Sequence, residues 1–151
     1  MSDTVQPGTH LWLVLFKTYQ TLRTHDLKSI ESTGLCLSDF GVLEILLHKG
    51  PLPVNAIGEK VLLTSGSITT AVDRLEKKGL VERRFSESDR RVRMVHLTEA
   101  GRVLIEDAFA AHQAALERAT SGLDADEKTL LIDLLKKLGL EANRLLLETN
   151  K

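Results

Sequence analysis

The clearest alternation of apolar and polar positions lies between Leu62 and Leu80. Apolar residues recur there at i, i+3, i+4 and i+7, which predicts a helix with one buried stripe. The stripe consists of Ile68, Ala71, Val72 and Leu75. The opposite face carries Gly66, Thr70, Asp73 and Lys77, flanked by Ser67, Thr69 and Arg74. Thr64 or Ser65 is expected to cap the start of this helix and Gly79 to end it, so a narrow polar face should point outwards.

Two short segments rich in β-branched and bulky apolar residues follow this helix. Val81 to Phe85 and Val92 to Leu97 are predicted strands, and the polar run Ser86 to Arg91 between them is the expected turn. A helix followed directly by such a hairpin has the layout of a winged helix. From Arg74 to Arg93 the chain has eight basic and four acidic residues, a net charge of +4, although the whole chain carries −1. This local concentration of positive charge predicts a surface that binds phosphates.

Helical spacing and capping residues predict the other elements. Further helices are expected over roughly His10 to Ser32, Asp39 to His48 with Ser38 as its cap, Val54 to about Leu62 behind Pro53, and Thr98 to about Ser121. A last helix is expected after the capping box of Asp124 and Glu127. The third of these helices and the 65–78 helix are short and joined by a tight turn, which indicates a helix-turn-helix.

The last helix contains more leucine than one thin globule can bury. Its stripe is formed by Leu130, Leu131, Leu134, Leu135, Leu138, Leu145 and Leu146. We therefore expect the first helix and the last two helices to pack against the same helices of a second copy, as in a symmetric homodimer. The predicted fold class is mainly α with a small β wing, in a single domain over 1–151. A winged helix-turn-helix lobe at 33–97 would be joined to a helical dimerisation lobe at 8–32 and 98–148.

Composition is typical of a globular chain, with 42% hydrophobic and 27% charged residues. No apolar run approaches the roughly 18 residues of a membrane span, and the start lacks a basic signal region, so a cytoplasmic location without membrane partners is expected. The single cysteine, Cys36, excludes an intrachain disulfide. Residues 64–67 lack the lysine of a phosphate-binding loop, and the histidines show no close metal-ligand spacing. Neither an enzyme, a cofactor nor a metal site is predicted.

The predicted helix-turn-helix and wing indicate double-stranded DNA as the partner. A helix-turn-helix places the first residues of its second helix in the major groove. The candidates for base edges and phosphates there are Ser65, Ser67, Thr69 and Thr70. The expected phosphate contacts are Arg74, Arg83 and Arg84, and those for the minor groove are Arg90 and Arg91, with Asp89 paired to Arg91. The alternative is a winged-helix module that binds proteins and not DNA.

These residues also carry a family resemblance. The run Val72 to Val81, followed by Asp89-Arg90-Arg91 and by Leu97-Thr98-Glu99-Ala100-Gly101, resembles the MarR (multiple antibiotic resistance regulator) family of winged-helix repressors. The resemblance implies a homodimer that binds a pseudo-palindromic operator and releases it when a small molecule or an oxidant binds or reacts. It assigns the wing roles to Asp89 and Arg91, and places 65–70 in the recognition helix. Many members carry a basic residue at the position of Thr70, so base readout should be lighter here.

The resemblance also suggests where an effector would act. In this family a ligand pocket lies between the dimer helices and the DNA-binding lobe, which makes Trp12, Phe16, Phe40 and His112 candidates for contact with an aromatic acid or a phenol. Packing in the core is the alternative for the three aromatic residues. For each histidine, His112 included, a solvated or capping role is expected in place of metal binding. Residues 40–50 and 61–75 look like members that respond to quinones, so Cys36 is either a reactive sensor or a structural cysteine.

Overall fold

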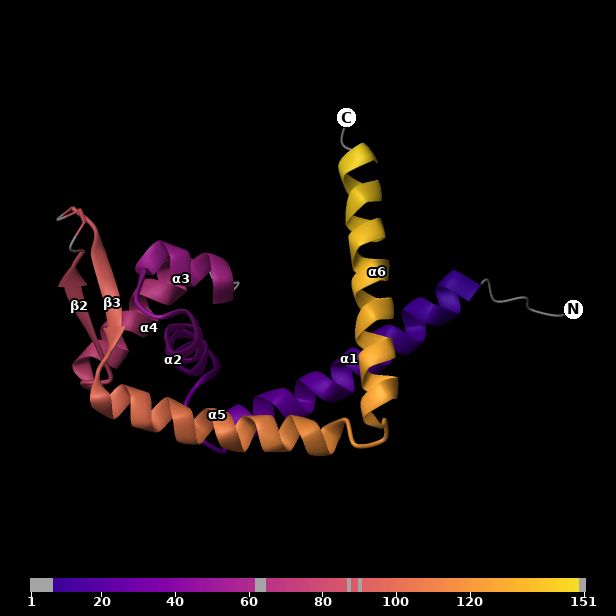
Figure 1. The fold of residues 1–151 in the computed structure, drawn as a ribbon, viewed down its shortest axis with the longest axis horizontal. Helices are drawn as coiled ribbons and strands as arrows, with labels where there is room; N and C mark the ends of the chain where they lie inside the picture. The colour runs from indigo at the N-terminus through magenta and orange to yellow at the C-terminus, as the bar shows by residue number, and fades with distance from the viewer. Residues whose placement is uncertain (1–6, 62–64, 87, 90, 150–151) are drawn as a thin grey trace, which may run out of the picture. The chain divides into compact units, whose positions relative to one another are not determined.

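The computed structural model describes residues 7–61, 65–86, 88–89 and 91–149, and it confirms the expected mainly helical fold with a small wing (Figure 1). The chain divides into two compact units at the junction of Leu116 and Glu117. The elements in order are α1 (Pro7–Glu31), α2 (Leu37–Lys49), β1 (Leu52–Pro53), α3 (Val54–Val61), α4 (Ser65–Lys77), β2 (Val81–Phe85), β3 (Arg93–Leu97), α5 (Glu99–Ala119) and α6 (Ala125–Thr149).

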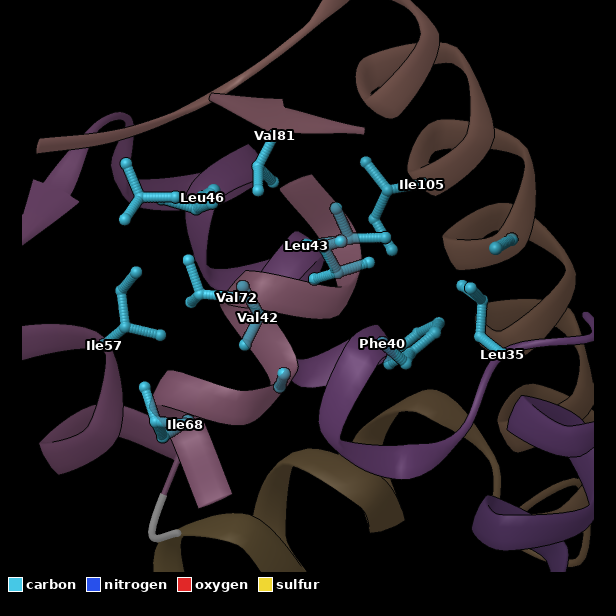
Figure 2. Packing of buried hydrophobic residues seen from close by; sticks show 14 of the residues in the cluster. Leu35, Phe40, Val42, Leu43, Leu46, Ile57, Ile68, Val72, Val81 and Ile105 are labelled. Carbon is cyan, nitrogen blue, oxygen red and sulfur yellow. The ribbon is translucent and has the colours of Figure 1, made fainter. Parts of the chain in front are cut away.

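The core of the first unit forms around α2 and α4. The apolar stripe predicted for α4 is confirmed, because Ile68 is 1% exposed and Ala71, Val72 and Leu75 are fully buried. These side chains join those of α2 and α3, together with Val81, Val95 and Ile105, in one cluster (Figure 2). The buried stripe fixes which face of α4 remains outside.

The wing is a three-stranded antiparallel sheet in the order β1-β3-β2. Val81 of β2 lies opposite Leu97 of β3, and Leu52 of β1 lies opposite Val95. The predicted hairpin is confirmed, but the sequence analysis missed β1. Two residues are too few to show the alternation typical of a strand. Proline in such an edge strand loses no hydrogen bond of the sheet interior.

The expected cap of α2 was wrong. The helix begins at Leu37 with Cys36 as its N-cap, and no side chain caps it. Ser38 lies in the first turn, where its Oγ accepts a hydrogen bond from Arg74 Nη2 at 3.1 Å. The Ser38 hydroxyl, which was expected to cap α2, therefore binds Arg74 of α4 instead. The cap expected for α4 at Thr64 lies outside the described residues.

The Leu-Thr-x-x-Gly segment joins α5 to the turn between α4 and β2. Thr98 Oγ1 donates to the carbonyl oxygen of Gly79 at 2.7 Å and accepts from the N–H of Gly101 at 3.0 Å. The backbone N–H of Thr98 also donates to the carbonyl oxygen of Leu80 at 3.1 Å. A Cβ at Gly101 would lie 1.9 Å from that same oxygen of Leu80, so only glycine permits this approach. The motif thereby fixes the base of the wing.

The second unit consists mainly of α6. Its predicted capping box is confirmed, since Asp124 and Glu127 exchange side-chain to backbone hydrogen bonds of 2.9 Å. No residue of α6 is buried. Its exposed apolar residues are Leu130, Leu131, Ile132, Leu134, Leu135, Leu138, Leu140, Leu145, Leu146 and Leu147. Within the described residues, none of the helices has the length and apolar character needed to cross a membrane.

Candidate nucleic-acid interface

The outward face of α4 is polar and open. Gly66, Thr70, Asp73 and Lys77 are all exposed, as expected, and so are the predicted contacts Ser67 and Thr69. Thr70 Oγ1 donates to the carbonyl oxygen of Gly66 at 3.0 Å, and the residue remains exposed. Ser65 is the first residue of α4. The N-terminal half of α4 therefore offers small groups that can approach base edges closely.

Arg83 connects the wing to α4. Its Nη2 lies 2.6 Å from Asp73 Oδ1, and its Nη1 and backbone N–H both donate to Glu76. Burial lowers the pKa of Arg83, but the hydrogen bonds to Asp73 and Glu76 outweigh it and raise the pKa above its ordinary value. The side chain is only 16% exposed. Arg83, which was predicted to hold a phosphate, is thus placed between two carboxylates and holds β2 against α4.

Arg74 is anchored by a buried carboxylate of α2. Its Nε lies 3.0 and 3.1 Å from the two carboxylate oxygens of Asp39, its Nη2 also donates to Asp39, and the carboxylate side chain is 2% exposed. Lys78 Nζ adds a longer contact of 3.5 Å. Burial raises the pKa of Asp39, but the hydrogen bonds and the charge of Arg74, aided by Cys36 and Lys78, hold it below its usual value. The hydrogen bond to Asp39 raises the pKa of Arg74.

The wing tip is organised by Asp89. Its Oδ1 accepts the backbone N–H of Arg91 at 2.9 Å, and its carbonyl oxygen accepts the N–H of Val92 at 3.0 Å. We expected Asp89 to pair with the Arg91 side chain, but the hydrogen bond that the structure shows is to the backbone. Among the described residues, Arg91 and Lys77 take part in no ion pair, whereas Arg84 pairs with Glu82. The predicted contact Arg90 lies outside the described residues.

A cavity of about 610 Å³ is lined by residues of α1, α2, α3 and α5. The lining residues are Arg23, Asp26, Ile30, Leu37, Phe40, Gly41, Glu44, Ile45, His48, Lys49, Lys60, Val61 and His112. Two of the predicted ligand contacts, Phe40 and His112, meet here with ring centroids 5.0 Å apart in an edge-to-face arrangement. The cavity combines an apolar wall with three cationic side chains, Arg23, Lys49 and Lys60, and with two carboxylates, Asp26 and Glu44.

His112 is neither solvated nor a helix cap, so that expectation was wrong. It is 7% exposed, its Nδ1 lies 2.6 Å from Ser29 Oγ, and its Nε2 lies 3.5 Å from Asp26 Oδ1. Both partners belong to α1, so the imidazole joins α5 to α1 beside the cavity. In the described part of the chain, no group of three histidine, cysteine or acidic residues is arranged to hold a metal ion.

The other three predicted ligand contacts lie elsewhere. Trp12 and Phe16 are 61% and 44% exposed, with ring centroids 6.0 Å apart on the surface of α1, so they are not in the core of this chain. Cys36 is also exposed, and its Sγ lies 3.4 Å from Arg74 Nη2 and 3.3 Å from Ser38 Oγ. No basic neighbour of this cysteine was predicted, because Arg74 lies 38 positions away along the chain.

Sequence reasoning also missed Asp39 as the partner of Arg74, and Asp26 and Ser29 as partners of His112. A carboxylate in the first turn of a helix is common for electrostatic reasons alone, so the sequence offered no signal that Asp39 is buried. The position of Ser29 in its helix is compatible with a solvent-facing hydroxyl as well as with a buried one. These contacts arise only when separate helices pack.

Comparisons with known proteins agree with this architecture. Residues 35–92 match the model of the MarR family. The HTH-type transcriptional regulator MhqR of Bacillus subtilis (strain 168) is 42% identical over 134 residues, which cover 89% of this chain and 92% of that protein. A mutant MarR from E. coli, solved in complex with operator DNA, matches with a TM-score of 0.72 and 25% identity over 91% of this chain and 99% of that chain.

A MarR family protein of Mycobacterium tuberculosis, solved in complex with p-aminosalicylic acid, matches with a TM-score of 0.68 and 28% identity over 85% of this chain and 98% of that chain. The relatives are transcriptional regulators and not enzymes. The polar face of α4 and the basic wing are the features that such a regulator needs to bind DNA. This chain belongs to the MarR family of DNA-binding transcriptional regulators.

Proposed function

We propose that the protein is a homodimeric repressor that binds a pseudo-palindromic operator and is released by a small aromatic ligand or an electrophile. The observation that carries the proposal is the exposed polar face of α4 beside a wing whose Arg91 is outside any ion pair of the described residues. Two such units related by a twofold axis would enter major grooves about 34 Å apart, as in other helix-turn-helix dimers.

The operator is tested by selecting bound duplexes from a random pool and measuring affinity by fluorescence anisotropy. Arg91→Ala should weaken binding to the selected duplex substantially, because a guanidinium in a narrow minor groove is lost. Arg102→Gln removes the same charge from the exposed start of α5 and serves as the matched control. Unchanged affinity for Arg91→Ala would contradict the proposed role of the wing.

Exposed apolar side chains support the homodimer. On α1 they are Leu11, Trp12, Leu13, Val14, Phe16 and Tyr19, and α6 adds its leucines. Monomeric proteins rarely leave such large apolar surfaces in water, so a second copy is the expected cover. Sedimentation equilibrium should give twice the chain mass of 16.7 kDa. A stable single subunit at micromolar concentration would contradict this part of the proposal.

The cavity beside Phe40 and His112 is the proposed effector site. Arg23 lies on its wall and is otherwise exposed, so Arg23→Gln should leave the fold intact. Hydroxybenzoates should bind the wild type and release the operator, and they should bind Arg23→Gln more weakly because a charge-assisted hydrogen bond is lost. Uncharged hydroquinones should be affected less. Equal binding of hydroxybenzoates to both proteins would place the effector elsewhere.

The proposed release by an electrophile depends on Cys36. A thiolate is the form of cysteine that attacks electrophiles, and here it would face the guanidinium group of Arg74. Conjugate addition to a quinone would form a sulfur–carbon bond, break a C=C π bond of the ring and move its electron pair to a quinone oxygen. Uptake of one proton there, and transfer of the hydrogen of the attacked carbon to the second oxygen, would give a hydroquinone thioether. Cys36→Ser should then keep the operator bound in the presence of a quinone. Normal release from Cys36→Ser would show that Cys36 is only structural.

A further inference from the structure

The wing carries a large aromatic side chain that is mostly exposed to solvent. Phe85, the last residue of β2, is 60% exposed. Arg93, the first residue of β3, lies directly opposite in the register, and its guanidinium carbon lies 5.2 Å from the centroid of the Phe85 ring. The pair is a cation–π contact at the outer end of the sheet, where no core holds either side chain.

The strand register shows which face of the wing carries this pair. Alternate residues of a strand share a face, so Phe85 lies on the same side as Arg83. Arg83 reaches Asp73 on α4 from that side. Phe85 and Arg93 therefore continue the α4-facing side of the hairpin towards its tip, beyond the ion pairs that Arg83 makes.

An arginine in a cation–π contact still has N–H donors for another partner. The cation–π contact draws on the charge of Arg93 and does not pair its N–H donors with an oxygen, and those donors fit two oxygens of a phosphate. Arg93 differs in this respect from Arg83 and Arg84, whose guanidinium groups already donate to carboxylates. Among the described residues Arg93 makes no ion pair, so none of the described carboxylates neutralises its charge.

We propose that Arg93, positioned by its contact with Phe85, binds a phosphate of the DNA backbone between the groove entered by α4 and the groove reached by the wing tip. This inference rests on the proposed binding of an operator. Arg93 is the phosphate contact and Phe85 is a positioning residue. The contact carries no base information, so it adds to affinity for every sequence and fixes the register of the wing on the duplex.

The experiment measures affinity for the selected operator by anisotropy as a function of salt concentration. The logarithm of the binding constant falls with the logarithm of salt, with a slope of about −0.9 for each phosphate contact on B-DNA. Arg93→Gln should reduce the magnitude of the slope by about 0.9 per protomer. It should weaken binding to operator and to unrelated duplexes by the same factor. Arg102→Gln, which removes an equal charge from α5, should leave the slope unchanged.

Two substitutions of Phe85 isolate the stacking contact without changing charge. Phe85→Leu should weaken binding by roughly threefold per protomer, the factor typical of one exposed cation–π contact, and Phe85→Tyr should restore it. Circular dichroism checks that each variant is folded. The inference is overturned if Arg93→Gln keeps the wild-type slope, or if Phe85→Leu binds as the wild type does. Absence of any salt-dependent binding by the wild type would instead overturn the proposed function.

Discussion

The ion pair between Asp39 and Arg74 makes a prediction about the stability of the first unit. Breaking a fully buried ion pair by removing one partner costs about 3–5 kcal/mol. The Asp39 side chain is 2% exposed, but that of Arg74 is 39% exposed, and Lys78 remains 3.5 Å from the carboxylate. Water and Lys78 would compensate part of the loss. We therefore expect Arg74→Gln to lower the free energy of unfolding by about 2 kcal/mol.

A double-mutant cycle separates the pair from its surroundings. Urea unfolding of the wild type, Asp39→Asn, Arg74→Gln and the double variant should give a coupling free energy of about 1–2 kcal/mol. All four proteins are measured at one chain concentration, because association would otherwise shift the apparent stability. The exposed pair of Arg102 and Glu106, 3.8 Å apart, is the matched control and should give at most about 0.5 kcal/mol.

The same pair predicts a dependence on pH. The pKa of Asp39 in the folded chain lies below its ordinary value of 3.8, so the unfolded chain binds more protons in the interval between the two values. The stabilisation is present above the ordinary value and is lost as the pH falls through the folded pKa. Asp39→Asn should remove this acid-dependent part. A coupling below about 0.5 kcal/mol, or the same acid dependence in Asp39→Asn, would refute the reasoning.

Two further predictions concern the segment that joins α5 to the wing. Gly101→Ala places a methyl group 1.9 Å from the carbonyl oxygen of Leu80 and should lower the free energy of unfolding by at least about 3 kcal/mol, whereas Gly139→Ala, with nothing within 4 Å, should not destabilise the chain. Urea unfolding compares the two, and equal stability would contradict the close packing. Thr98→Val should cost about 1–2 kcal/mol because the cap to Gly101 and the bond to Gly79 are lost, and Thr98→Ser should keep most of the stability in thermal unfolding.

Elements in which apolar residues recur at a regular spacing over several residues could be predicted from the sequence. The stripe from Ile68 to Leu75 repeats at helical spacing over two turns, and burial of that stripe determines that Thr70 and Asp73 point outwards. The hairpin likewise follows from two bulky segments and a polar turn. β1 contains only two residues, and its pairing with β3 becomes visible only when the strands are brought together. Two residues cover a single period of the strand alternation, which is too short to distinguish a strand from a loop.

Partners of charged residues could not be predicted in the same way. The excess of basic residues around the wing was correctly located, but it said nothing about which of them are neutralised. Arg83 lies between Asp73 and Glu76, and Arg74 meets Asp39, which lies 35 positions away in the sequence. A count of charges treats all arginines alike. The fold determines which of them remain available for phosphates.

The helix α2 joins the cavity to α4 through two adjacent residues. Phe40 meets His112 beside the cavity, and Asp39 holds Arg74 of α4. Consecutive residues of a helix point about 100° apart, so one turn can reach both neighbours. Val42, Leu43 and Leu46 of α2 are almost fully buried, so close packing on this side of the helix resists local bending. A ligand that displaces the Phe40 ring would therefore shift Asp39 as well. We expect that shift to change the contact between Asp39 and Arg74 without unfolding the first unit.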